Sequence, residues 1–259
     1  MIRFTIITCT YNASSVLQRT LSSVMMQKYE YVEHRILDGK SKDTTLGIAE
    51  KYKKENDATG CKHEIIIRSE PDKGLYDAMN KGIRQANGDY IIFLNAGDAF
   101  PNSDTLSTIA SSVKDRKTLP GIIYGDTDIV DMDGKFIRHR RLSPGDNITW
   151  RSFKYGMLIC HQAFYARTDI AKTTPYNDKD FRLSADVDWC IRIMKKSENK
   201  HIPLLRVNAV VVNYLEGGMS IQNHKASLKE RFCIMKKHYG LTTTVLMHLY
   251  FVFRSISKK

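Results

Sequence analysis

The sequence lacks any run of apolar residues approaching the ~18 to 20 that are needed to cross a bilayer. Its start leads straight into a strand-like segment, without the successive charged, apolar and cleavage regions of a secretion signal. The 5 cysteines are scattered, and no pair has the spacing of zinc ligands. We therefore expect reduced thiols in a cytoplasmic protein, either in solution or peripheral on the inner face of the cell membrane.

Two common phosphate-binding signatures are also missing. The Gly-x-Gly-x-x-Gly fingerprint does not follow the first expected strand, so NAD or FAD binding has little support. Asp38–Ser41 is similar to the end of a P-loop, but His34 stands where that motif requires a glycine.

Acidic residues are the scarce charged class, with 28 Asp and Glu against 40 Lys and Arg. The formal net charge of +12 predicts a surface that attracts an anionic partner. Nucleic acid, an acidic membrane and a phosphorylated small molecule all fit, so charge alone does not choose among them.

What is present is a regular alternation of apolar segments and helical patterns through the first half of the 259 residues. The expected strands are 3–9, 31–37, 63–69 and 90–94, and the expected helices are 14–27, 44–55 and 75–86. The first helix is expected to bury Leu17, Leu21, Val24 and Met25. Asn12 and Ser14 suit its start as capping residues. This order predicts an α/β fold, with a mostly parallel sheet sandwiched by helices.

The second half has a different pattern, which favours a smaller α+β extension folded onto the sheet. Short paired runs at 122–124 and 136–138 flank a turn at 131–134. A helix at 186–196, a strand at 202–212, a loop at 216–220 and a helix at 225–239 follow. We expect residues 1–240 to form one domain with halves 1–100 and 101–240.

The tail, residues 241–259, combines a wide apolar helical face with terminal cations. Such a basic amphipathic helix fits docking at an anionic membrane surface. A last helix packed on the core explains the pattern equally well. The sequence leaves both interpretations open.

Four polar clusters fall at or just beyond the carboxyl ends of successive expected strands, the edge where α/β sheets gather their sites. They are Thr10–Asn12, Asp38–Asp43, Glu70–Gly74 and Asn95–Asp98. Each alone suits an ordinary polar loop, and Asp98 alone suits a turn before Pro101. Four such clusters at one edge favour a binding site.

The helix at 75–86 has two distinct faces. Its apolar face is Leu75, Ala78, Met79, Gly82, Ile83 and Ala86, and its polar stripe is Asp77, Asn80, Lys81 and Arg84. Helical spacing accounts for the stripe either as a solvated face or as a grip on a hydroxylated, charged ligand.

A further pair of acids, Asp186 and Asp188, lies in the first turn of the helix expected at 186–196. Acids there are stabilised by the helix dipole, so simple capping is one interpretation. The other is a carboxylate that removes a proton from an incoming hydroxyl.

Taken in order, the motifs resemble those of family 2 glycosyltransferases, which have the GT-A fold. They are Thr10–Asn12, Leu37–Thr44, Ser69–Gly82, Gly88–Asp98 and Ala185–Asp188, and the resemblance covers roughly residues 3 to 195. It implies a metal-dependent, inverting transfer of a sugar from a nucleoside-diphosphate donor, with a UDP-linked donor favoured. Short relatives of this kind build surface polysaccharides, which implies a glycan or lipid-diphosphate-linked saccharide as acceptor.

The resemblance also implies roles for individual residues. The nucleotide-sugar-binding residues would be Thr10, Tyr11, Asn12, Asp38, Asp72, Lys73, Asp77, Lys81 and Asn95. Asp98 would hold Mn²⁺ or Mg²⁺ against the diphosphate, because hard oxygen ligands suit those ions. Asp186 would be the catalytic base, with Asp188 as the second choice.

The chain departs from the family pattern at two places. The usual Asp-x-Asp motif is Asn95–Asp98 here, which leaves one carboxylate for the metal. The Glu that commonly precedes the base is Ala185.

His161 and Gln162 are further candidates, for contact with the acceptor, although the apolar neighbours of His161 also suit a core histidine. Two other functions stay open. A nucleotidyltransferase acting on a sugar phosphate would be expected to show a Gly-rich loop near the first strand. A nucleic-acid-binding module would be expected to cluster its cations with exposed aromatics, so no nucleic-acid partner is expected.

Overall fold

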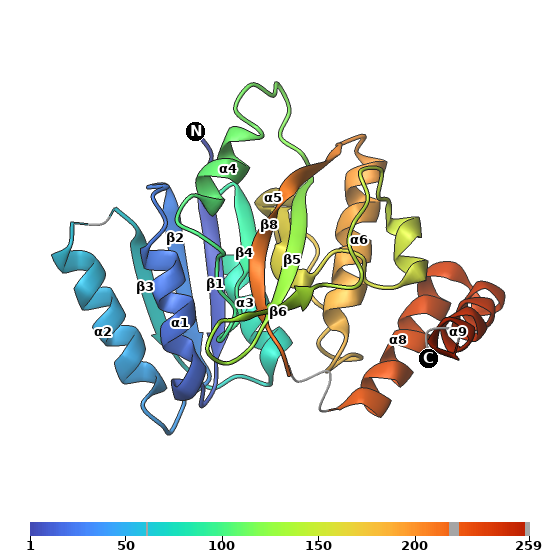
Figure 1. The fold of residues 1–259 in the computed structure, drawn as a ribbon, viewed down its shortest axis with the longest axis horizontal. Helices are drawn as coiled ribbons and strands as arrows, with labels where there is room; N and C mark the ends of the chain where they lie inside the picture. The colour runs from blue at the N-terminus through green and yellow to red at the C-terminus, as the bar shows by residue number, and fades with distance from the viewer. Residues whose placement is uncertain (61, 218–222, 257–259) are drawn as a thin grey trace.

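The structure is a computed structural model that describes residues 1–60, 62–217 and 223–256 (Figure 1). The first half contains β1 (Phe4–Thr10), α1 (Ser14–Met25), β2 (Val32–Asp38), α2 (Thr45–Ala58), β3 (Glu64–Ser69), α3 (Leu75–Gln85), β4 (Tyr90–Phe93) and α4 (Thr105–Ser111). The second half contains β5 (Ile122–Val130), β6 (Phe136–His139), η1 (Trp150–Tyr155), η2 (His161–Ala163), β7 (Phe164–Arg167), α5 (Thr168–Lys172), α6 (Ala185–Asn199), β8 (Leu204–Leu215), α8 (His224–Tyr239) and α9 (Leu241–Ile256).

Within the described residues, the strands form one 8-stranded sheet of order β3-β2-β1-β4-β7-β5-β6, with β8 also paired to β5. β3, β2, β1 and β4 run parallel, which confirms the predicted parallel core. β7 pairs antiparallel with both β4 and β5, so the sheet as a whole is mixed.

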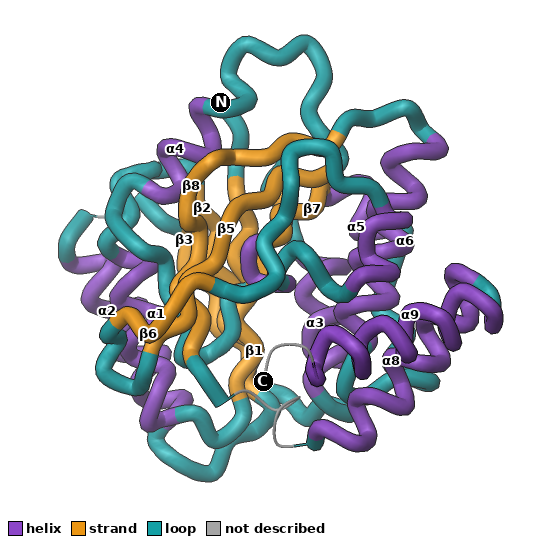
Figure 2. Tube along the Cα trace, turned by 45° about the vertical axis from the view of Figure 1, so that its right-hand side comes forward, coloured by secondary structure: helices purple, strands orange, loops and turns teal. Residues whose placement is uncertain are grey.

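Helices cover both faces of the sheet, as the alternation predicted (Figure 2). On one face, Leu17 and Leu21 of α1 pack with Tyr52 of α2 against Ile36 of β2. On the other, α3 and α6 contribute to the main core, where Trp189 is fully buried. This core draws side chains from both halves of the chain.

Several short elements of the second half were not predicted. β7 is the most important of them, because its 4 residues join the parallel strands to the rest of the sheet. Strands are confirmed at 122–124 and 136–138 as parts of β5 and β6, but β5 extends to Val130, and β6 pairs with residues 128–130 instead of 122–124. The expected strand at 202–212 is β8, which extends to Leu215, and residues 218–220 of the loop predicted next lie outside the described part.

The predicted capping of α1 was wrong. Its N-cap residue is Ala13, and no side chain of that residue caps the helix. Instead, Asp43 accepts a hydrogen bond from the Ser14 amide at 3.1 Å, so the loop between β2 and α2 supplies the acceptor. The Asn12 side chain accepts from the Lys42 amide at 2.8 Å and ties the same two loops together.

The polar stripe predicted on α3 was wrong at Asn80. This residue is 6% exposed, and its amide donates to the Tyr176 carbonyl at 3.1 Å and accepts from the Tyr176 amide at 2.7 Å. Asn80 therefore joins α3 to the segment before α6 and does not face a ligand.

The thiols and the membrane prediction can be checked over the described residues. Cys9, Cys160 and Cys190 are free and buried, Cys233 is free and exposed, and Cys61 lies outside the described part. None of the helices in residues 1–60, 62–217 and 223–256 combines the length and the apolar character that a membrane crossing requires.

The contrast between Asn80 and Arg84 gives a test of the fold. Asn80→Ala should lower the free energy of unfolding by about 2 kcal/mol, because two backbone groups of Tyr176 lose their partner in the interior. Arg84→Ala, on the exposed side of the same helix, should change it by less than about 0.5 kcal/mol. Equal losses in denaturant unfolding would contradict the assignment.

Candidate active site

The predicted polar clusters meet at one edge of the sheet. Thr10 of β1 lies beside Asp38 of β2, and Asp38 lies beside Ser69 of β3. Because parallel strands end at the same edge, the loops that follow them border a common region. This region is the candidate site.

Asp38 is the centre of the hydrogen bonding at this edge. It is 3% exposed, and its carboxylate accepts from the Ser69 hydroxyl at 2.5 Å and from the amide and hydroxyl of Ser41. The Thr10 hydroxyl lies 3.4 Å away. Both carboxylate oxygens are thus engaged in joining the loops after β1, β2 and β3.

Tyr11, Gly39 and Asp72 form one wall of the site. Tyr11 is 61% exposed, so its ring offers a flat apolar surface on which a base can stack. A Cβ at Gly39 would come within 2.5 Å of the Asp72 carboxylate and 3.5 Å of the Tyr11 ring. Glycine at this position lets all three groups lie close together.

The predicted residues around α3 mostly hold its preceding loop in shape. The Asp72 carboxylate accepts from the Gly74 amide at 2.9 Å, and Asp77 accepts from the Lys73 amide at 3.0 Å. Lys81 pairs with Asp77 at 3.5 Å and with Glu70 at 3.1 Å. Lys73 is exposed.

Asp98 lies where β4, β8 and η2 converge. It is 4% exposed, and its two oxygens accept from the Leu215 amide at 2.9 Å and from the Gln162 side chain at 3.0 Å. Burial raises the pKa of Asp98 to about 7, although both hydrogen bonds act in the opposite direction.

The neighbours of Asp98 explain why a second acid is missing. Gly97 has φ of +98°, and a Cβ there would come within 2.6 Å of the Leu215 side chain. An aspartate at 97 would therefore be strained and crowded. The Asn95 side-chain oxygen is buried and has no hydrogen-bond partner among the described residues, so it is available to a donor group of a ligand.

The protein oxygens at this position suit a metal ion that is coordinated mainly by the phosphates of a bound substrate. No group of three or more His, Cys, Asp and Glu side chains suited to a metal occurs in residues 1–60, 62–217 and 223–256. Mg²⁺ and Mn²⁺ sites of phosphate-binding enzymes often use one or two carboxylates plus phosphate oxygens. Asp98 supplies a hard oxygen of that kind.

The two acids at the start of α6 have different environments. Asp188 has no exposed side-chain surface and is bonded to Arg192 at 2.6 Å, His238 at 2.9 Å and Lys237 at 3.3 Å. Burial alone would raise the pKa of Asp188, but these partners hold it well below its usual value. Asp188 is therefore a structural link between α6 and α8.

Asp186 is partly exposed and accepts a hydrogen bond from the Tyr76 hydroxyl at 3.1 Å. Burial raises the pKa of Tyr76, and the Asp186 charge raises it further, so this phenol stays a donor. One carboxylate oxygen is held by α3, and the partly exposed carboxylate can receive a proton.

Asp186 and Asp98 both influence one side chain, Tyr214. Burial raises the pKa of Tyr214 in β8, and the negative charges of Asp98 and Asp186 raise it further. Both carboxylates thus lie within electrostatic reach of one phenol.

His161 and Gln162 lie in the interior, and each is 5% exposed. His161 bonds to the Tyr176 hydroxyl at 2.5 Å and stacks on Phe93, and burial lowers its pKa. Gln162 donates to Asp98. The predicted contact of these two residues with an acceptor is therefore not supported.

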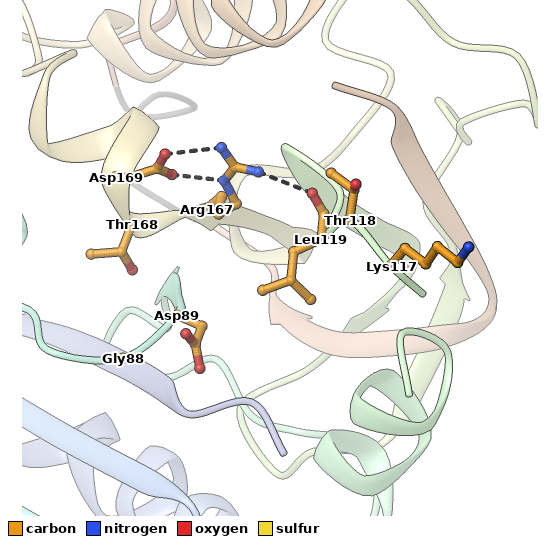
Figure 3. A pocket seen from close by; sticks show the side chains of 8 residues that line it. All are labelled: Gly88, Asp89, Lys117, Thr118, Leu119, Arg167, Thr168 and Asp169. Carbon is orange, nitrogen blue, oxygen red and sulfur yellow. Dashed lines mark hydrogen bonds and ion pairs between the residues drawn. The ribbon is translucent and has the colours of Figure 1, made fainter. Parts of the chain in front are cut away.

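A cavity of about 490 Å³ lies at the opposite edge of the sheet and is separate from this site (Figure 3). It is lined by Gly88, Asp89, Lys117, Thr118, Leu119, Arg167, Thr168 and Asp169. Arg167 is bonded to Asp169 and to the Leu119 carbonyl, so its charge is already paired. No predicted site residue lines it.

Sequence reasoning missed Tyr76 and the Leu215 amide. Tyr76 stands next to Asp77 inside the Ser69–Gly82 motif, so a phenol within a ligand motif was the available signal. The Leu215 contact joins backbone to side chain across 117 positions, and no local pattern marks it.

The parallel strands with loops at one edge and a mixed continuation of the sheet are the GT-A fold. Solved structures share this fold. TarS 1-349 of S. aureus, in complex with UDP-GlcNAc, matches with a TM-score of 0.67 and 15% identity, over 99% of this chain and 73% of that one. The mannosyltransferase PcManGT from Pyrobaculum calidifontis, in complex with GDP-Man and Mn2+, gives 0.64 and 16%, over 96% and 70%.

The particular family follows from the sequence comparisons. Residues 5–174 match the family described as Glycosyl transferase family 2, and the chain belongs to this family. A PGL/p-HBAD biosynthesis glycosyltransferase of Mycobacterium bovis is 32% identical over 219 residues, 84% of this chain and 78% of that one. The amylovoran biosynthesis glycosyltransferase AmsB of Erwinia amylovora is 30% identical over 204 residues, 75% and 64%.

Family membership decides among the functions left open by the sequence. The protein is a nucleotide-sugar-dependent glycosyltransferase, and the nucleotidyltransferase and nucleic-acid-binding alternatives lose their support.

The buried carboxyl of Asp98 predicts a pH dependence of stability. Its pKa of about 7 in the fold exceeds its usual value of 3.8, so the neutral form stabilises the fold. That stabilisation is complete below pH ~4 and is lost as the pH rises through ~7. In metal-free buffer, Asp98→Asn should match the wild type in unfolding free energy at pH ~4 and exceed it at pH ~8, by about 1.4 kcal/mol per unit of raised pKa.

Asp133→Asn, on the exposed turn between β5 and β6, is the matched control and should leave the pH profile unchanged. A wild type that remains more stable than Asp98→Asn at the alkaline end would show that the carboxylate is stabilised in its charged form.

Proposed function

We propose that the protein transfers a sugar from a nucleoside-diphosphate sugar, with inversion, to a hydroxyl of a glycan or lipid-diphosphate-linked saccharide. Surface polysaccharide synthesis at the inner face of the cell membrane is the proposed setting. The relatives named for PGL/p-HBAD and amylovoran biosynthesis support such an acceptor. TarS, whose structure holds UDP-GlcNAc, supports a UDP-linked donor.

The observation that carries the proposal is the contrast between Asp186 and Asp188. Only Asp186 combines partial exposure with a fixed orientation, through Tyr76. Asp188 is buried and bonded to Arg192, Lys237 and His238. Asp186 is therefore the proposed general base.

The first half of the chain is the proposed donor side. The nucleobase of the donor would stack on Tyr11. Thr10, Asn12 and Asp38 would shape the pocket for the nucleobase and the ribose. Asp72, Lys73, Asp77 and Lys81 would border the sugar and diphosphate. Asn95 would accept a hydrogen bond from a donor hydroxyl, since its buried oxygen is otherwise unpaired.

The proposed reaction is a single in-line displacement. The acceptor oxygen forms a bond to the anomeric carbon on the face opposite the diphosphate, and its proton passes to Asp186. The bond from the anomeric carbon to the phosphate oxygen breaks, and the nucleoside diphosphate leaves with the electron pair. When bound at Asp98, Mn²⁺ or Mg²⁺ would offset the charge of that leaving group.

A panel of nucleotide sugars with Mn²⁺ tests both the reaction and the role of Asp186 as general base. The readout is the release of nucleoside diphosphate. One donor should be turned over above the others. Asp186→Asn should lose roughly 10² to 10⁴ in turnover while donor binding survives, because only the proton acceptor is removed. Asp188→Asn should lose stability in thermal unfolding instead, since Arg192 and Lys237 lose their charged partner and His238 loses its carboxylate contact.

Near-normal turnover in Asp186→Asn would refute its role as base. A panel in which no nucleotide sugar is bound or hydrolysed would refute the proposed reaction.

The metal role of Asp98 has a separate test. Calorimetric titration of UDP should show tighter binding to the wild type when Mn²⁺ is present, and Asp98→Asn should remove most of that gain while binding UDP alone as before. The same Mn²⁺ response in both proteins would exclude Asp98 as the metal ligand.

A further inference from the structure

The C-terminal helix α9 exposes its apolar half. Its outward side chains, between 43% and 76% exposed, are Leu241, Val245, Leu246, Leu249, Tyr250, Val252 and Phe253. At 100° per residue they occupy one continuous half of the helix. Surface helices of globular domains normally bury this half and expose the polar one.

The other half of α9 packs on the protein. Thr244 is fully buried. The ring of His248 packs against that of Phe232 in α8, with 5.0 Å between the ring centroids. Phe251 lies beside His248 at 5.8 Å. The more polar half thus faces inward, so the tail does pack on the protein, but without burying its apolar face.

An exposed apolar patch of this size usually marks an interaction surface. The charges around it indicate what covers it. Lys225, Lys229 and Lys236 fall on one side of α8, at helical spacing, and all are exposed. Phe232 lies in the same stripe and contacts α9, so the lysines border the line where the two helices meet.

Within the described part of α8 and α9, the cations greatly outnumber the acids. In residues 223–259 the sequence has one acidic residue, Glu230. Its carboxylate accepts from the backbone amides of Arg182, Leu183 and Ser184 at 2.8 to 2.9 Å.

We propose that α9 lies in the surface of an anionic lipid bilayer, with its apolar half among the acyl chains and the α8 lysines on lipid phosphates. A helix with a broad apolar face and neighbouring cations is of the kind that lies along a membrane surface. A second copy of the chain is the weaker occupant, because two such surfaces would bring like charges together.

The α8–α9 pair is firmly attached to the start of α6. Besides the Glu230 contacts, the Ser184 and Ser227 hydroxyls lie 2.9 Å apart, and Asp188 bonds to His238 at 2.9 Å. Given the proposed role of Asp186, which rests on the proposed function, a docked α9 fixes the orientation of the catalytic base relative to the bilayer.

Flotation of the full chain with vesicles of phosphatidylcholine, with and without phosphatidylglycerol, tests the surface. The wild type should float only with the anionic vesicles. The double variant Leu249→Glu and Phe253→Glu should lower partitioning by about a hundredfold, since two exposed apolar anchors are lost. Lys229→Gln and Lys236→Gln should each lower partitioning to the anionic vesicles about fivefold. The contribution of these lysines should disappear at high salt, because salt screens their charges.

Met132→Glu is the matched control, because Met132 is 62% exposed on the turn between β5 and β6. It should float like the wild type. Unchanged flotation of the α9 double variant, or equal flotation with neutral vesicles, would overturn the proposal.

Sedimentation velocity without lipid tests the alternative that a second copy of the chain covers the apolar half of α9. A dimer that the α9 double variant converts to monomers, together with no vesicle binding, would assign the face to a second copy and overturn the proposal. No donor sugar is present in these assays, so their outcome is independent of the proposed chemistry.

Discussion

The parallel register of β1, β2 and β3 is the constraint on which the site depends. Thr10, Asp38 and Ser69 lie side by side because these strands end together at one edge. Asp38 then bonds across all three strands and fixes the loops that follow them. The wall formed by Tyr11 and Asp72 exists only because those loops are held in place.

Much of this arrangement could be predicted from the sequence, because buried parallel strands are continuous apolar runs and the helices between them repeat every 3.6 residues. Local patterns did not reveal β7, whose 4 residues offer too short a run. They also could not separate Asp186 from Asp188, which share one helical turn. Their surroundings differ through long-range contacts, such as that of Asp188 with His238, 50 residues further along the chain.

The single acid after β4 shows how backbone geometry limits chemistry. Gly97 adopts a conformation that disfavours a side chain and lies against Leu215. Asp98 is in turn tied to the Leu215 amide, so the end of β8 restricts both positions. Under the proposed metal role of Asp98, a site with one carboxylate would depend on its substrate to complete the cation's coordination and would bind metal and nucleotide sugar together.

The junction between α8 and α9 is a single residue, Gly240, with φ of +82°. So short an elbow leaves α9 little freedom to swing relative to the body of the enzyme. An enzyme held on a surface by such an elbow would search for its acceptor in two dimensions, always presenting the same side. The distance between the bilayer surface and Asp186 would then be fixed. It would select acceptors by the height of their reactive hydroxyl above the lipid.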